Sequence, residues 1–125
     1  MDTSISTITL FAEDLVATKA FYLTVFDLPV HYEDDDSCVF DFGNTLINLL
    51  RVENAPEVVA PASIGIPHTT RSLITITVAD VDEAADDLAA KGVEVLNGPI
   101  DRPWGVRTVA FQDPTGVVWE FAQPL

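Results

Sequence analysis

Apolar and polar residues alternate in short runs along most of the chain, and two longer stretches have helical spacing instead. Alternation with a period of two is typical of half-buried strands, whereas apolar residues three or four apart are typical of amphipathic helices. In "TITLFA", for example, Ile8, Leu10 and Ala12 share one face of a strand. Turn-forming residues separate the runs, as in "DDD", "GN" and "DPTG". We therefore predict short strands with two helices.

The order of one strand, a helix and three strands occurs twice. "TITLFAEDLVATKAFY" at 7–22 aligns with "LITITVADVDEAADDL" at 73–88, which places Asp14 on Asp80. Each aspartate directly precedes helical spacing, and aspartate is a preferred N-cap residue. Internal similarity on this scale indicates two copies of one supersecondary unit.

The ends of the two copies also align. "DFGNTLINLL" at 41–50 lies over "DPTGVVWEFA" at 113–122, which places Asn48 on Glu120. The predicted elements are strands at 5–12, 29–34, 37–42 and 45–52 with a helix between Asp14 and Pro29, then strands at 72–79, 93–97, 106–112 and 116–123 with a helix at 81–91 closed by Gly92.

A chain of 125 residues fits one domain, residues 1–125, built from two similar units. The first unit is expected at about residues 4–53 and the second at about 72–124. Between them, residues 54–71 are rich in proline, glycine, alanine and threonine and are interpreted as a linker. Such a linker lets the units pair within one chain or exchange with a partner chain, and the sequence leaves both arrangements open.

Composition excludes several classes of function. The chain has 20 acidic and 6 basic residues, a net charge of −14, which disfavours binding to nucleic acid and to anionic membranes. Cys38 is the only cysteine, so neither an intramolecular disulfide nor a cysteine-built zinc site can form. The first residues lack a basic signal-peptide region, and no apolar run approaches the roughly 18 residues of a membrane span. We expect a soluble, cytoplasmic protein.

The two units, with "ITLFAEDLVATKAFY" near the start and "VRTVAFQDPTGVVWEF" near the end, resemble the vicinal-oxygen-chelate superfamily. This superfamily holds glyoxalases, extradiol dioxygenases, fosfomycin-resistance enzymes and bleomycin-binding proteins, and the resemblance covers essentially the whole chain. It implies an α+β fold in which two βαβββ units form a curved mixed sheet around a cup, with helices on the outer face. These motifs identify a fold better than a function, because the scaffold hosts many chemistries.

Strand alternation then assigns side chains to the cup. The aliphatic residues of the first strand suit the helix-covered face, so the cup receives the remaining ones. With the equivalent positions of the second unit and those that alternate with Asn48 and Glu120, the cup set is Thr7, Thr9, Phe11, Leu46, Leu50, Leu73, Thr75, Thr77, Val118 and Ala122. Trp119 and Phe121 point outward under a helix. An apolar cup with a few hydroxyls, one amide and one acid fits an organic ligand.

The resemblance also identifies where metal-using members hold a divalent ion. In this sequence those positions are Thr7, Asn48, Leu73 and Glu120. Leucine cannot coordinate, and a neutral hydroxyl or amide is a weak ligand, which leaves one carboxylate. We expect no metal and no other cofactor. Glu120 either serves a ligand, as a polar partner or a general base, or is partly solvated or paired with Arg107.

"RPWGVRTVAFQDPTGVVWEF" is especially similar to bleomycin-binding resistance proteins, which are acidic, metal-free dimers that sequester a cationic, aromatic drug. Trp104 either stacks on a ligand or makes a dimer or strand contact. Arg102 and Arg107, which flank it, either bind an anionic ligand group or form a structural salt bridge with Asp101 or Glu120. Phe11, Phe40 and Phe111 line the pocket or belong to the core.

Together these observations predict a metal-independent, homodimeric small-molecule-binding protein that resembles antibiotic-sequestering proteins. The alternative is a glyoxalase-like lyase or isomerase that uses Glu120 as its base or as the sole strong metal ligand, and the sequence leaves the choice between binding and catalysis open. The predicted ligand-binding residues are Thr7, Thr9, Phe11, Asn48, Leu73, Thr75, Trp104, Arg107, Phe111 and Glu120.

Overall fold

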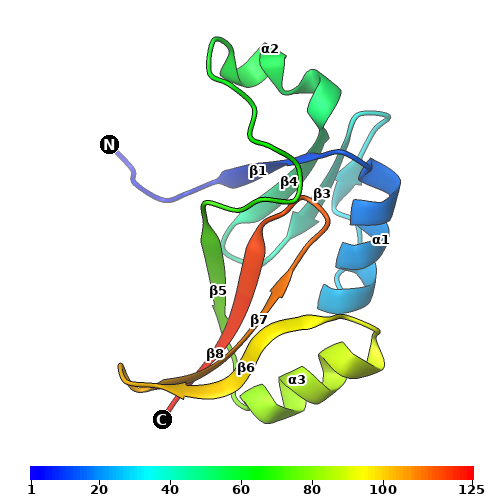
Figure 1. The fold of residues 1–125 in the computed structure, drawn as a ribbon. Helices are drawn as coiled ribbons and strands as arrows, with labels where there is room; N and C mark the ends of the chain where they lie inside the picture. The colour runs from blue at the N-terminus through cyan, green and yellow to red at the C-terminus, as the bar shows by residue number, and fades with distance from the viewer. The chain divides into compact units, whose positions relative to one another are not determined.

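The computed structural model describes residues 1–125 and divides them into two compact units, Met1–Pro67 and His68–Leu125. Each unit contains a four-stranded mixed sheet with a helix packed against one face (Figure 1). Both units follow the order β, α, β, β, β. The α+β class and the repeated βαβββ unit predicted from the sequence are therefore confirmed.

In the first unit, the sheet has the strand order β1-β4-β3-β2, with β1 parallel to β4 and the other pairs antiparallel. Its elements are β1 (Thr7–Ala12), α1 (Leu15–Phe26), β2 (Tyr32–Glu33), β3 (Ser37–Asp41) and β4 (Leu46–Arg51). Helix α1 begins where expected, because the Asp14 carboxylate accepts a hydrogen bond from the Ala17 backbone amide at 3.0 Å.

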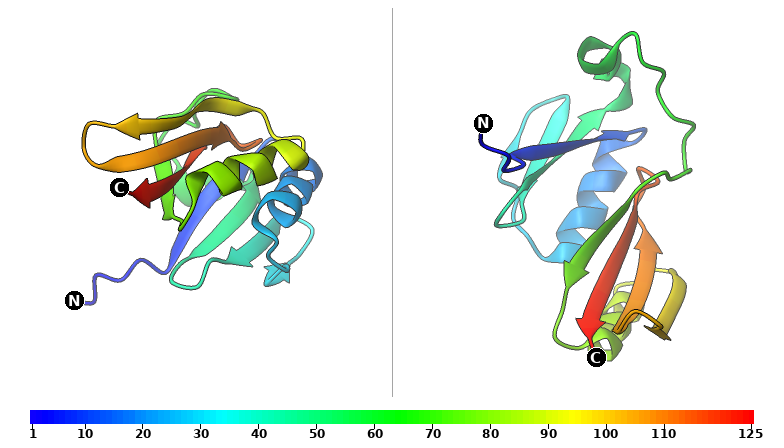
Figure 2. Two further views of the ribbon diagram at one scale, coloured as in Figure 1. Left: turned by 90° about the horizontal axis from the view of Figure 1, so that it is seen from below. Right: turned by 90° about the vertical axis from the view of Figure 1, so that its left-hand side faces the viewer.

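The second unit repeats this arrangement with the strand order β5-β8-β7-β6 and a parallel β5–β8 pair. Its elements are β5 (Leu73–Thr77), α3 (Val81–Ala90), β6 (Val95–Arg102), β7 (Val106–Gln112) and β8 (Val118–Pro124). Figure 2 shows β8 between β5 and β7 from two further sides. Asp80 caps α3 through the Glu83 amide at 3.0 Å, as Asp14 caps α1.

Each unit buries its core between its helix and its sheet. In the first unit, Tyr22 of α1 is fully buried and its ring lies 5.4 Å from that of Phe40 on β3. In the second unit, Leu88 of α3 and Trp119 of β8 are buried. The Trp119 indole donates to the Asp113 carboxylate at 3.0 Å, which joins the "DPTG" turn to this core. No helix of the structure is long and apolar enough to span a lipid bilayer.

Three predicted elements differ from the structure. The expected linker contains a short 3₁₀ helix, η1 (Val52–Asn54), and a helical turn, α2 (Pro56–Val59), which proline at its first position favours. Strand β2 has two residues instead of six, and β6 continues to Arg102, beyond the predicted end at 97. Pro99 is compatible with β6 because β6 is the edge strand of its sheet.

Candidate functional site

Each sheet carries its helix on one face and leaves the other face without a helix. We call the latter the open faces. On the first open face, Thr9 of β1 is the direct neighbour of Asn48 on β4, and on the second, Thr75 of β5 is the direct neighbour of Glu120 on β8. The same faces carry Thr7, Phe11, Leu46 and Leu50 in the first unit and Leu73, Thr77, Val118 and Ala122 in the second. The structure thus groups these cup residues within each unit, by strand pairing.

The two units contain equivalent polar pairs. Asn48 Nδ2 donates to Thr9 Oγ1 at 3.3 Å, and Thr75 Oγ1 donates to Glu120 Oε1 at 3.1 Å. Asn48 and Glu120 are half-buried, and the residues two positions before and after each of them, on the same face of the strand, are aliphatic. The repeat therefore places one neutral amide and one acid at equivalent positions, each joined to a threonine.

The Asn48 amide is incompletely bonded. Its Oδ1 atom is buried and has no hydrogen-bond partner. Turning the amide over would leave its NH₂ group at the same buried place, so neither orientation satisfies both ends. A buried acceptor without a donor costs about 1–3 kcal/mol, and such groups are rare in folded proteins. Either an enclosed water or a donor from a bound molecule that enters beside this atom would remove the cost.

Trp104 lies in the turn between β6 and β7 and is 68% exposed, which is unusual for so large an apolar side chain. The Arg102 guanidinium lies 5.8 Å from the centre of its ring. Arg102 also donates from Nε to Thr108 Oγ1 at 3.0 Å and from Nη2 to Asn97 Oδ1 at 2.9 Å. These contacts hold Arg102 on the second open face, with neither Asp101 nor Glu120, the two salt-bridge partners that the sequence suggested, as its partner.

Arg107 and Phe111, two predicted ligand-binding residues, lie on the helix-covered face of β7. Arg107 donates from Nε to Asp101 at 2.7 Å and from Nη1 to Asp82 of α3 at 3.0 Å, and its guanidinium lowers the pKa of Asp101. Phe111 is 0% exposed, and its ring lies 5.1 Å from that of Phe121. These side chains have structural partners away from Glu120, so we omit both from the site. Phe40 is likewise buried in the core of the first unit.

The side chains at the four positions that are equivalent to the metal ligands of metal-using members do not fit a divalent ion. Thr7 and Asn48 offer neutral oxygen atoms in the first unit, and Leu73 offers no donor in the second, so Glu120 is the single charged ligand. Elsewhere in the chain, no three His, Cys, Asp or Glu side chains lie together in an arrangement that can hold a metal.

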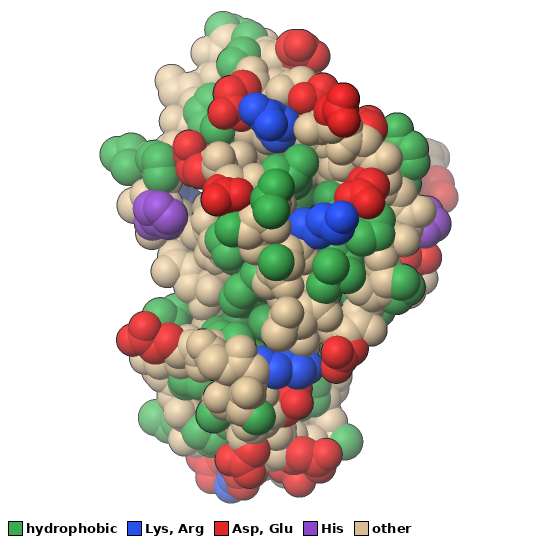
Figure 3. Space-filling view, turned by 90° about the vertical axis from the view of Figure 1, so that its right-hand side faces the viewer, with side chains coloured by type: hydrophobic (Ala, Val, Ile, Leu, Met, Phe, Trp, Pro, Cys, Tyr) green, Lys and Arg blue, Asp and Glu red, His purple; other side chains and the backbone are tan.

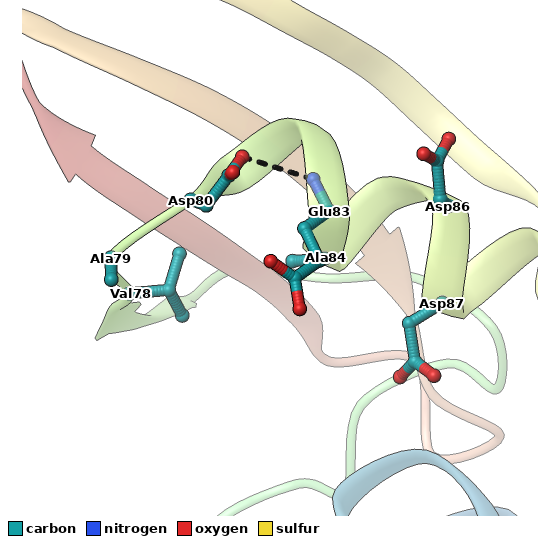
Figure 4. Close-up of a pocket in the computed structure, with 7 residues that line it drawn as sticks. All are labelled: Val78, Ala79, Asp80, Glu83, Ala84, Asp86 and Asp87. Atoms are coloured by element: carbon teal, nitrogen blue, oxygen red, sulfur yellow. Dashed lines mark hydrogen bonds between the residues drawn. The ribbon is translucent and has the colours of Figure 1, made fainter.

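An open hollow lies along α3, lined by Val78, Ala79, Asp80, Glu83, Ala84, Asp86 and Asp87 (Figure 4). The Asp80 carboxylate in this hollow caps the helix, and Asp87 pairs with Lys91 at 2.9 Å. Carboxylates are also common over the surface seen in Figure 3, where basic side chains are few. We therefore attribute the acids of this hollow to the solvated surface of a protein with a charge of −14.

Residues 4–121 match the Glyoxalase/Bleomycin resistance protein/Dioxygenase superfamily, and the chain belongs to this superfamily. Among solved structures, a glyoxalase/bleomycin resistance protein/dioxygenase from Nocardioides is 24% identical, with a TM-score of 0.88, over 100% of this chain and 85% of that one. A glyoxalase-related enzyme from Fulvimarina pelagi is 22% identical, with a TM-score of 0.84, over 98% of this chain and 88% of that one.

A lactoylglutathione lyase from Agrobacterium tumefaciens is also similar, at 23% identity and a TM-score of 0.77, over 98% of this chain and 95% of that one. None of the curated proteins matches the chain. At these identities the similarity establishes the fold, and the function has to be argued from the side chains of the open faces.

Proposed function

We propose that this protein binds a small organic molecule on its open faces without a metal. The observation that carries the proposal is the buried, unpartnered Oδ1 of Asn48, set beside Thr9 on a face that is otherwise largely apolar. A ligand N–H or O–H on the first open face would satisfy this acceptor, and on the second open face Glu120 offers an acceptor of its own. Members of the superfamily commonly bind small molecules and dimerise, and we expect a homodimer here.

The ligand we propose is aromatic and carries a hydrogen-bond donor or a cationic group. Trp104 provides an exposed ring on which an aromatic group can stack, and Glu120 provides a carboxylate that favours a donor. The net charge of −14 raises the concentration of cations near the surface. Sequestration of such a compound, as in the bleomycin-binding proteins that the sequence resembles, is the role that these features support best.

Catalysis is the second candidate, because Glu120 is half-buried on an apolar face and is placed to accept a proton. A lyase or isomerase would also need donors that stabilise a developing oxyanion. The direct neighbours of Asn48 and Glu120 offer only threonine hydroxyls and the Asn48 amide, which already donates to Thr9. The Arg102 guanidinium, a further donor on the second open face, bonds to Asn97, two strands away from Glu120. These groups suffice for binding and are sparse for proton transfer followed by oxyanion stabilisation.

Elemental analysis of the purified protein, followed by thermal shift, tests the proposal. The panel contains divalent metals, bleomycin-type compounds and smaller cationic aromatic compounds. We expect no stoichiometric metal and an increase in Tm with at least one aromatic compound. Glu120→Gln and Trp104→Ala should reduce that increase, whereas Glu57→Gln, which removes the same charge from the exposed surface of α2, should not.

A stoichiometric metal that is lost in Glu120→Ala would overturn the proposal and favour the lyase or isomerase. Light scattering coupled to gel filtration measures the assembly separately, and we expect a mass twice that of the chain.

A further inference from the structure

We propose that Arg102 forms an anion subsite on the second open face, so that the ligand is an aromatic carboxylate. This inference rests on the proposed function and specifies the ligand class. An anionic ligand is not what the net charge of −14 would favour, because a negative surface attracts cations. Around β6, however, the local arrangement of side chains favours an anion.

The irregularity of β6 places Arg102 beside Asn97. These two residues are five positions apart, and in a regular strand an odd separation puts side chains on opposite faces. The pairing of β6 with β7 shifts register between Val95 and Asn97 and again between Asn97 and Ile100. The second shift lies between Asn97 and Arg102, and one such bulge reverses the alternation. As a result, both side chains lie on the open face and hydrogen-bond to each other.

Arg102 is held by neutral partners. Its Nε and Nη2 atoms donate to Thr108 and Asn97, which use two of the five N–H groups of a guanidinium and leave three. No carboxylate lies within ion-pair distance of Arg102, although Lys19, Arg51, Lys91 and Arg107 all have one; Arg71, the other basic residue without an ion pair, is exposed. In a chain with 20 acidic residues, a fixed and uncompensated guanidinium is therefore a specific local feature.

The surroundings of Arg102 favour a carboxylate attached to a ring. A guanidinium presents a planar fork of donors that matches the two oxygens of a carboxylate. Trp104 lies against this guanidinium and exposes its ring, and Ile100, also on the open face, is 45% exposed. A ligand ring can therefore rest on apolar surface while its carboxylate reaches Arg102.

Glu120 lies on the same face but does not neutralise Arg102. Asn97, Ala110, Glu120 and Thr75 form one row of direct neighbours across β6, β7, β8 and β5. Asn97 and Glu120 are thus two strand spacings apart, about 10 Å, with the short Ala110 side chain between them. An aromatic acid that spans this distance would place its carboxylate at Arg102 and a donor at Glu120.

Three compounds with the same ring test this inference: benzoate, benzamide and benzylammonium. Binding to the full chain is measured by NMR from the Trp104 indole N–H and the Arg102 Nε–H resonances. We expect benzoate to bind about tenfold more tightly than benzamide, a difference typical of one charge-assisted contact. Arg102→Gln should abolish the preference, and the matched control Arg107→Gln, the same change on the helix-covered face of this hairpin, should retain it.

Equal binding of benzoate and benzamide would overturn the inference, and so would an Arg102→Gln protein that is less stable but keeps the preference. Binding of benzylammonium alone at Trp104 would also overturn it while leaving the proposed function intact, with Glu120 as the anchor. If Arg102→Gln does not fold, added NaCl provides the test in the unchanged protein. An anion subsite requires the preference for benzoate to fall with salt, and a preference that does not change would contradict the subsite.

Discussion

At the scale of single residues, the repeat provides pairs of equivalent positions that differ in one chemical property. Asn48 and Glu120 both pair with a threonine, but Asn48 leaves a buried oxygen without a partner. We predict that Asn48→Leu, which removes this oxygen at similar volume, raises the free energy of unfolding by about 1 kcal/mol. Urea denaturation measures the change.

The same substitution should weaken binding of a ligand on the first open face, because a donor on that ligand would lose its acceptor. For stability, Thr9→Val is the comparison, since it leaves the buried oxygen in place and should therefore not raise the free energy of unfolding. If Asn48→Leu lowers the free energy of unfolding, Oδ1 has a partner in solution, and the observation behind the proposed function is lost.

Asp41 and Asp113 form a second equivalent pair. Asp113 is 3% exposed and accepts hydrogen bonds from the Trp119 indole and from both the amide and the hydroxyl of Thr115, whereas Asp41 is exposed and accepts from the Gly43 amide. We predict that Asp113→Ala lowers the free energy of unfolding by about 3 kcal/mol and Asp41→Ala by less than about 1 kcal/mol. Chemical denaturation of both variants provides the comparison, and similar losses would refute it.

At the scale of elements, sequence alternation predicts most strands because each sheet buries one face. The aspartates before α1 and α3 were also recognisable as caps, because a cap depends only on neighbours within one turn. The faces of Thr9, Asn48, Thr75 and Glu120 followed from the same alternation. What the sequence could predict is therefore mainly local.

The errors arose where structure depends on partners distant in the chain. Phe111 of β7 pairs with Trp119 of β8, and paired residues point to the same face of a sheet. The face of Trp119 was predicted correctly, but the sequence does not show that Phe111 is its partner. Gly98 and Pro99 indicated a loop, so the sequence offered no reason to place Arg102 and Arg107 on opposite faces of a sheet. The bulges that continue β6 through these residues depend on its contacts with β7.

The turn between β2 and β3 provides a pH-dependent element. The Asp36 amide, the Tyr32 hydroxyl and the Ser37 hydroxyl donate to the Asp34 carboxylate, and these bonds lower its pKa. A lowered folded-state pKa contributes stability above the unfolded pKa of about 3.9, and this stability is lost as the pH falls through the folded value.

We therefore predict that Asp34→Asn, which cannot ionise, is less stable than the natural chain at neutral pH, and that the difference shrinks as the pH falls below about 4. Urea midpoints between neutral and acidic pH measure this difference. Asp35→Asn serves as the control because it removes the same charge from the neighbouring residue, whereas the hydrogen bonds of this turn go to Asp34. A difference for Asp34→Asn that grows on acidification would contradict the assignment.

At the scale of the whole molecule, the charge of −14 disfavours the folded state at neutral pH because like charges are brought together on folding. Raising the salt concentration from about 0.02 to 0.5 M shortens the screening length and should raise Tm by roughly 5 °C. Differential scanning calorimetry in NaCl measures this effect. At the isoelectric pH the salt-induced increase in Tm should nearly disappear, because the net charge is zero. An equal increase in Tm at that pH would mean that the salt acts by a mechanism other than screening.

Gly98 determines how the hairpin could be re-engineered. Its φ is +90°, and a Cβ atom there would lie 2.2 Å from the Thr108 backbone oxygen, so no other residue fits without moving the strand. A randomised library meant to change ligand preference should therefore keep position 98 constant and vary positions 97, 100, 102 and 104. Variants with new preferences should then accumulate at the four varied positions, while every change at Gly98 is removed by selection for folding, whatever ligand is used.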